Sequence, residues 1–164
     1  MQTWVEVDED LEDFVALAPA DRIPEGWLGV LAAVDIRGRD VTLVHRDDPR
    51  LRRLALFDAV TNNSDRKGIH LLPSAGAVLG CDHGLCFHRE PKLRTVLWGW
   101  AGEPLRADEE ALLERTRAVA PQVLEEFLTA AEIRAVVARA EAMMASATLP
   151  VPQDGWPSIP WPPL

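Results

Sequence analysis

A helix, a polar loop and a β-hairpin follow one another in the middle of this chain, and their order constrains the fold most. Asp48 is a favourable N-cap and Pro49 suits the first helical position, with apolar residues following at helical spacing. The helix is predicted to end at Asn62 and Asn63, where a polar loop begins. Two short β-rich runs then flank a turn at residues 74–76, which predicts a hairpin.

Weaker signals predict the other elements. We expect a strand at residues 3–7, a short helix ending at Pro19, a hairpin around residues 37–39, and helices at 108–119, 121–128 and 130–147. The last 15 residues contain six prolines and two tryptophans, so they are predicted to be extended. The predicted class is α+β, mainly helical, with one domain over residues 1–148 and a Pro/Trp-rich tail over 149–164.

Composition excludes several classes of protein. The 164 residues suffice for one domain with a sizeable core. A net charge of −9 argues against nucleic-acid binding, which needs a basic surface. No apolar run approaches the roughly 20 residues of a membrane span, and no signal segment opens the sequence, so the expected location is cytoplasmic. Two cysteines, five residues apart, give no disulfide framework.

The stretch GCDHGLCFH, residues 80–88, is dense in residues that can bind metals. Cys81, His83, Cys86 and His88 are all competent zinc ligands, although zinc sites usually pair two close ligands with two distant ones. A redox pair is disfavoured because the Cys-x-x-Cys spacing is absent. Buried thiols in a hairpin and its exit are the simpler interpretation. A zinc-binding module therefore stays a minor alternative.

The aspartates are more informative than the cysteines. Asp65 lies in the loop after the helix, His70 starts the following strand, and Asp82 ends the hairpin before Gly84. A carboxylate that orients an acceptor hydroxyl, a ligand five residues later and a second carboxylate after a hairpin form the arrangement that kinases use for phosphoryl transfer. Hard oxygen ligands hold Mg²⁺ on the phosphates, and a glycine after the metal aspartate eases the loop turn.

Two segments, FDAVTNNSDRKGIHLL and LGCDHGLCFH, resemble the catalytic and metal loops of the phosphatidylinositol 3-/4-kinase-like group. The pattern is closest to the type II lipid kinases, and the whole chain resembles an uncharacterised actinobacterial family that shares this kinase likeness. The resemblance implies a kinase-like lower lobe that uses ATP with Mg²⁺ or Mn²⁺.

Carried over residue by residue, the resemblance makes Asp65 the catalytic base, with Arg66 as its basic neighbour. It aligns Asn63 with the asparagine before that base, Asp82 with the metal aspartate, and Gly84 with the glycine of the same motif. His70 stands where the lipid kinases have a second metal-binding asparagine, and imidazole suits Mn²⁺ better than Mg²⁺.

The chain also departs from the kinase pattern. It has no Gly-x-Gly-x-x-Gly loop and no lysine before Lys67, so it resembles a lower lobe without a complete upper lobe. Lys67 is then either a phosphate contact or a surface lysine. The leading hypothesis is a phosphotransferase whose acceptor is a lipid, a protein or a small molecule, completed by an upper-lobe segment or a partner chain. The alternative is a catalytically inactive kinase-like scaffold or nucleotide-binding module.

Overall fold

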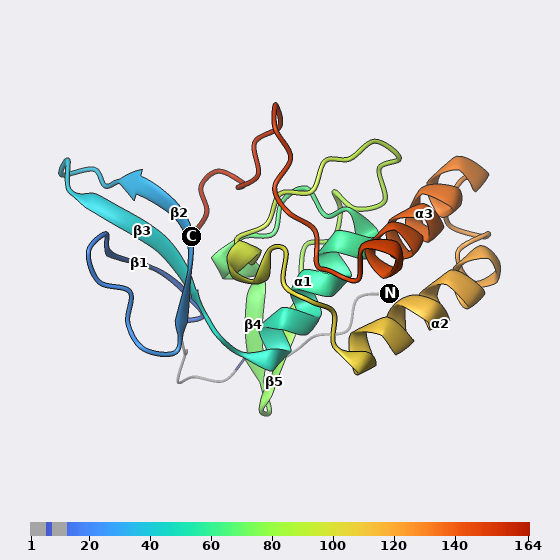
Figure 1. The fold of residues 1–164 in the computed structure, drawn as a ribbon, viewed down its shortest axis with the longest axis horizontal. Coiled ribbons are helices and arrows are strands. Elements are labelled where there is room, and N and C mark those ends of the chain that lie inside the picture. The colour runs from blue at the N-terminus through green and yellow to red at the C-terminus, as the bar shows by residue number, and fades with distance from the viewer. Residues whose placement is uncertain (1–5, 8–12) are drawn as a thin grey trace.

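The computed structural model describes residues 6–7 and 13–164, and places a three-stranded sheet at one end and packed helices at the other (Figure 1). The strands are β1 (Val15–Pro19), β2 (Trp27–Val34), β3 (Asp40–Arg46), β4 (Leu71–Ser74) and β5 (Ala77–Gly80). The helices of the described part are α1 (Pro49–Thr61), α2 (Ala107–Val123) and α3 (Ala130–Ser146), with two 3₁₀ turns, η1 (Gly68–His70) and η2 (Trp98–Trp100). These elements confirm the α+β class and its helical bias.

The larger sheet is antiparallel and has the order β1-β3-β2. Its central strand is buried on both faces: Leu43 and His45 share one face, and Val44 lies on the other. The edge strand β2 has a register shift between Gly29 and Leu31. The predicted hairpin around residues 37–39 is confirmed, because β2 and β3 flank it.

Residues 14–20 are the clearest error of the sequence interpretation. They were expected to form a short helix, but β1 occupies Val15–Pro19 and pairs with β3 from Val15 opposite His45 to Pro19 opposite Val41. Sheet pairing overrides local helix propensity in a segment this short. Of the strand predicted at residues 3–7, residues 3–5 lie outside the described part, and Glu6 and Val7 are not in a strand.

Helix α1 and its boundaries follow the sequence signals. The Asp48 carboxylate accepts a hydrogen bond from the Arg50 N–H, and Pro49 occupies the first turn. The helix ends at Thr61, and its C-cap residue Asn62 adopts the left-handed conformation with φ 57°. The β4–β5 hairpin then forms as predicted and pairs Leu71 with Gly80.

The two C-terminal helices pack on each other, and α3 also packs on α1 (Figure 1). The break expected at Pro121 does not occur, since α2 continues to Val123 and turns follow to Leu128. The capping box predicted at Thr129 and Glu132 is present: each side chain accepts a hydrogen bond from the other residue's backbone N–H.

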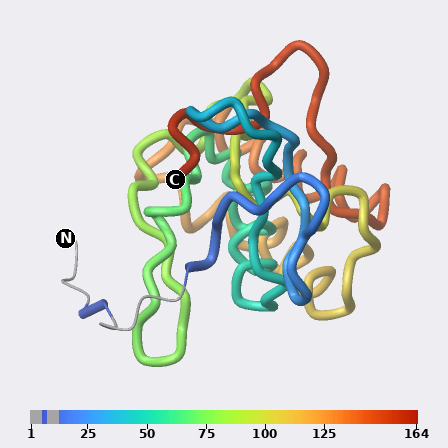
Figure 2. Tube along the Cα trace, turned by 90° about the vertical axis from the view of Figure 1, so that its left-hand side faces the viewer, coloured from blue at the N-terminus to red at the C-terminus, as the bar shows by residue number. Residues whose placement is uncertain are grey.

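The Pro/Trp-rich tail is extended and packs against the loops between the sheet and the helices (Figures 1 and 2). Its Ser158 carbonyl accepts hydrogen bonds from the Thr95 N–H and from the Trp98 indole. Further along, the Pro163 carbonyl accepts a 2.8 Å hydrogen bond from the Gly68 N–H. The tail is therefore joined to the polar loop that follows α1.

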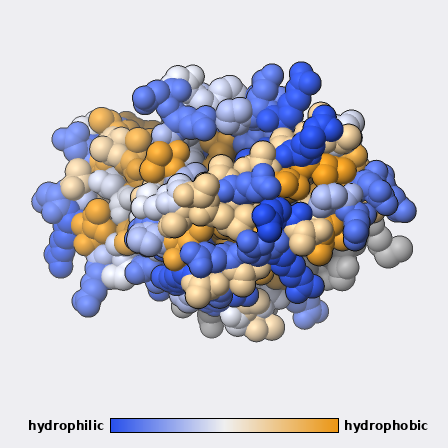
Figure 3. All heavy atoms as spheres, turned by 45° about the vertical axis from the view of Figure 1, so that its right-hand side comes forward, coloured by the Kyte–Doolittle hydropathy of each residue, from blue (hydrophilic) through white to orange (hydrophobic). Residues whose placement is uncertain are grey.

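The face of the molecule in Figure 3 interleaves hydrophilic and hydrophobic residues. Within the part of the chain that the structure describes, no helix combines the length and apolar character required to cross a bilayer.

Candidate functional site

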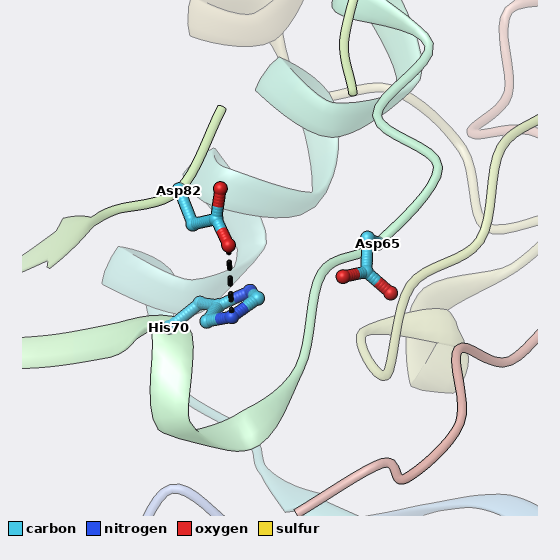
Figure 4. Close-up of side chains that lie close together, drawn as sticks. All are labelled: Asp65, His70 and Asp82. Carbon is cyan, nitrogen blue, oxygen red and sulfur yellow. Dashed lines mark ion pairs between the residues drawn. The ribbon is translucent and has the colours of Figure 1, made fainter. Parts of the chain in front are cut away.

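Three side chains from separate elements converge beside the end of α1 (Figure 4). Asp65 comes from the loop after α1, His70 from the end of η1, and Asp82 from the segment after β5. One ligand atom from each lies within 4.8 Å of the others, and His70 Nε2 is 3.6 Å from Asp82 Oδ2. The structure thus brings together the two aspartates and the histidine that the sequence analysis singled out, although Asp65 and Asp82 are 17 residues apart.

Asp65 lies between two cationic side chains. Lys67 Nζ is 3.2 Å from one carboxylate oxygen, and an Arg94 Nη2 is 3.8 Å from the other. The Asp65 backbone N–H donates to the Asn63 side-chain oxygen at 3.1 Å, and this local hydrogen bond stabilises the conformation of the loop. The Asp65 carboxylate thus has a cationic partner within 4 Å of each of its oxygens.

Asp82 is the open member of the cluster, with its side chain 64% exposed. Its backbone adopts φ 53°, a left-handed conformation that aspartate tolerates better than most residues. The turn expected at Gly84 therefore falls on Asp82 itself. A Cβ placed on Gly84 would meet only an Asp82 carboxylate oxygen, at 3.8 Å, so Gly84 has room for a larger residue.

His70 is buried, with 6% of its surface exposed, and its ring closes the η1 turn. The Nδ1 atom accepts a long hydrogen bond, 3.4 Å, from the Lys67 N–H. A neutral ring that accepts at Nδ1 carries its hydrogen on Nε2, the atom that faces Asp82. A metal-binding Nε2 would need the opposite arrangement, with Nδ1 donating to a carbonyl or a carboxylate. At 3.6 Å the His70 Nε2 faces the Asp82 carboxylate beyond hydrogen-bonding distance.

A buried ion pair lies beneath the cluster. Arg66 and Asp58 both have side chains with 0% exposure, and Arg66 Nη2 is 2.9 Å from Asp58 Oδ1. The Arg66 Nη1 donates to the Cys81 carbonyl at 3.0 Å, one residue before Asp82. Because Arg66 also directly follows Asp65, one guanidinium joins the two loops that carry the carboxylates.

Asp58 also accepts hydrogen bonds from other residues near the cluster. It accepts hydrogen bonds from the Asn63 amide at 2.9 Å and from the Thr95 hydroxyl at 3.2 Å. Arg66 and Asn63, two residues that the resemblance assigned to catalysis and to cofactor binding, are therefore placed to hold the loops, since neither has exposed surface. The sequence analysis missed Asp58 as a functional residue, although a carboxylate on the apolar face of α1 was a usable signal.

Gly80 is a second residue that the sequence analysis missed. A Cβ at this position would lie 3.0 Å and 3.1 Å from the two terminal nitrogens of Arg66, and 3.1 Å from His83 Nε2. Arg66 Nη2 is 2.9 Å from His83 Nε2. The pKa of His83 is lowered by burial and by the charge of Arg66, so the ring is neutral and accepts at Nε2.

The cysteines take no part in the cluster. Both are free and half-buried, and among the described residues neither Cys81 nor Cys86 belongs to a group of metal-competent side chains. Burial raises the pKa of Cys86, which disfavours the thiolate that zinc requires. The zinc alternative thus finds no support in the arrangement of the described residues.

A curated relative is similar to almost all of this chain. Protein Rv2133c of Mycobacterium tuberculosis (strain ATCC 25618 / H37Rv) is 44% identical over 178 residues, an alignment that covers 99% of this chain and 63% of that protein. The chain therefore spans about 63% of the length of this relative. No family model matches the chain. No solved structure matches it either.

Proposed function

We propose that the chain is the lower lobe of a phosphatidylinositol 3-/4-kinase-like phosphotransferase that uses ATP and a divalent cation. The observation that carries this proposal is the convergence of Asp65, His70 and Asp82 within 4.8 Å. Their order along the chain, after a helix, in a turn and after a hairpin, is that of a kinase catalytic loop followed by its metal loop. The resemblance of the two loop sequences to the lipid kinases supports the same assignment.

The donor set suits a hard divalent cation. The carboxylates of Asp82 and Asp65 offer oxygen ligands of the kind that Mg²⁺ and Mn²⁺ prefer, and Asp82 is open to solvent. A bound cation would neutralise charge on the phosphates of ATP. His70, with its Nε2 hydrogen toward Asp82, would orient that carboxylate or donate to a phosphate oxygen.

The remaining site residues orient the acceptor. Asp65 would accept the hydrogen of an acceptor hydroxyl, which aligns the oxygen for attack on the phosphorus. Lys67 and Arg94 flank this carboxylate and would attract a phosphate group. A lobe that covers the phosphates would come from the rest of a longer chain or from a partner. The acceptor is a hydroxyl group on a lipid, a protein or a small molecule.

The second candidate is a kinase-like scaffold without catalysis. The ion pair between Lys67 and Asp65 favours it, because the pair occupies the carboxylate that an acceptor hydroxyl would use. The sequence also has no glycine-rich phosphate loop.

Binding of Mn²⁺ to the purified chain tests the proposal, with electron paramagnetic resonance as the readout and ATP added in a second titration. We expect wild type to bind Mn²⁺. The Mn²⁺ affinity of Asp82→Asn should be at least about tenfold lower, since a charged oxygen ligand is lost. The control Asp108→Asn should bind Mn²⁺ as tightly as wild type does. Asp65→Asn should weaken Mn²⁺ less than Asp82→Asn does. Equal Mn²⁺ affinity in Asp82→Asn and wild type would refute the metal site at Asp82, and the kinase assignment would be refuted with it. Mn²⁺ binding that ATP does not strengthen would favour the scaffold.

A further inference from the structure

A second pocket is separate from the Asp65, His70 and Asp82 cluster and shares no lining residue with it. It has a volume of about 190 Å³ and opens between the end of α1, helix α3, residues 91–93 and the tail. Its wall is mostly apolar, with Leu93, Trp98, Met143 and Trp156 among the lining residues. Sites for drug-sized ligands span roughly 300–1,000 Å³, so this one suits a smaller molecule.

Arg139 of α3 forms part of this wall and lacks a counterion. Its Nε donates to the Val60 carbonyl at 2.8 Å and its Nη1 to the His88 carbonyl at 3.3 Å. Its Nη2 is buried and makes no hydrogen bond within the described structure. Buried donors without a partner are rare in folded proteins and call for a specific explanation.

The charge of this guanidinium is also uncompensated. Among the described residues, no carboxylate pairs with Arg139, and none of the residues that line the pocket is acidic. Burial lowers the pKa of Arg139 to about 10, which still leaves the side chain charged at neutral pH. An unpaired charge on a half-buried side chain among apolar residues is unfavourable, and an anion in the pocket would relieve that penalty.

Lys92 lies near the rim of the pocket, with Glu90 as its counterion at 4.0 Å. Lys92 Nζ lies 5.9 Å from the centre of the Trp156 ring and 3.3 Å from His88 Nε2. Cationic and aromatic groups at one opening favour a ligand that combines negative charge with an apolar body.

We infer that this pocket binds a small organic carboxylate, with its apolar body against Trp98, Met143 and Trp156 and its carboxylate toward Arg139. A carboxylate is favoured over a phosphate monoester because its single negative charge balances the one guanidinium of the pocket wall, whereas a phosphate would bring about −1.5 to −2 charges into a mostly apolar pocket. The inference does not rest on the proposed kinase function, since the pocket shares none of Asp65, His70 and Asp82.

Titration calorimetry with three probes tests this inference: 3-phenylpropionate, its neutral amide and phenyl phosphate. We expect wild type to bind the acid about tenfold or more tightly than the amide, because a charge-assisted hydrogen bond is lost in the amide. Arg139→Gln should bind the acid more weakly than wild type does by the same factor of about ten. Ala142→Leu narrows the pocket without a change of charge and should also weaken binding, while Arg134→Gln, an exposed position on the same helix, should not.

Several outcomes would overturn the inference. Equal affinity for the acid and the amide would exclude the guanidinium as the anchor. Tighter binding of phenyl phosphate than of the acid would refute the carboxylate assignment. Failure of wild type to bind the acid, or unchanged binding in Ala142→Leu, would show that the pocket is not the site. Arg139→Gln also loses hydrogen bonds to two carbonyls, so Ala142→Leu decides the question if that variant does not fold.

Discussion

Replacing Asp58 with Asn tests whether the buried ion pair beneath the site holds this fold together. The carboxylate accepts from Asn63, Arg66 and Thr95 at 2.9 to 3.2 Å. An asparagine keeps one acceptor oxygen but turns an N–H₂ group toward donors and leaves the Arg66 charge buried without a partner. Breaking a buried pair on one side costs about 3–5 kcal/mol, a large part of the roughly 5–15 kcal/mol that stabilises a domain.

The matched control is Asp108→Asn on α2. Asp108 pairs with Arg53 at 3.7 Å, but both side chains are more than 60% exposed, so solvent screens the pair and its loss should change stability by less than about 1 kcal/mol. Urea unfolding at pH 7, followed by tryptophan fluorescence and circular dichroism, gives both values. If Asp58→Asn and Asp108→Asn unfold at free energies within 1 kcal/mol of each other, the pair does not carry the stability that its geometry implies.

Two other changes test specific contacts. At Gly99, an added Cβ would lie 2.5 Å from His45 Nε2, so Gly99→Ala should lower the unfolding free energy by about 1–3 kcal/mol through overpacking. Gly84→Ala should change the unfolding free energy little, because a Cβ there has room. If urea unfolding ranks the two variants in the opposite order, the contacts described are contradicted. Burial lowers the pKa of His45, whose Nδ1 donates to the Arg46 carbonyl and whose Nε2 accepts from the Gly99 N–H. The unfolded chain then takes up a proton before the folded one, and stability should fall as pH drops below about 6.5. His45→Gln should flatten that fall between pH 6.5 and 5, and an unchanged slope would argue that other groups cause it.

Local signals were enough to predict the centre of the chain. Asp48 and Pro49 define the start of α1, and the turn at residues 74–76 defines the hairpin, because caps and turns depend on neighbours in sequence. The convergence of Asp65 with Asp82 was also predictable, since helix, loop and hairpin order places both at the same end of these elements. Strand β1 was not predictable, because its conformation depends on pairing with β3 some 25 residues later.

The functions of individual polar residues were harder to predict. Arg66 looked like a residue that faces a ligand, yet it is fully buried against Asp58, a partner eight residues earlier. For His70, predicted as a metal ligand, the tautomer depends on a backbone N–H of the same turn, which donates to Nδ1 at 3.4 Å. Such assignments require burial and hydrogen-bond partners, which residue type and spacing do not provide.

The docking of the tail has a consequence for the order of assembly during synthesis. Gly68, three residues after Asp65, donates its N–H to Pro163, and a Cβ at Gly68 would lie 3.5 Å from the Leu164 side chain. Residues 157–164 leave the ribosome after every helix and strand of the described structure. The loop that carries Asp65 therefore gains its contacts with the tail only after residues 157–164 have emerged. The hydrogen bond between Gly68 and Pro163 joins residues that are nearly 100 positions apart in the sequence. Contacts this distant form slowly, so a nascent chain would hold a folded helical core before it holds a finished site.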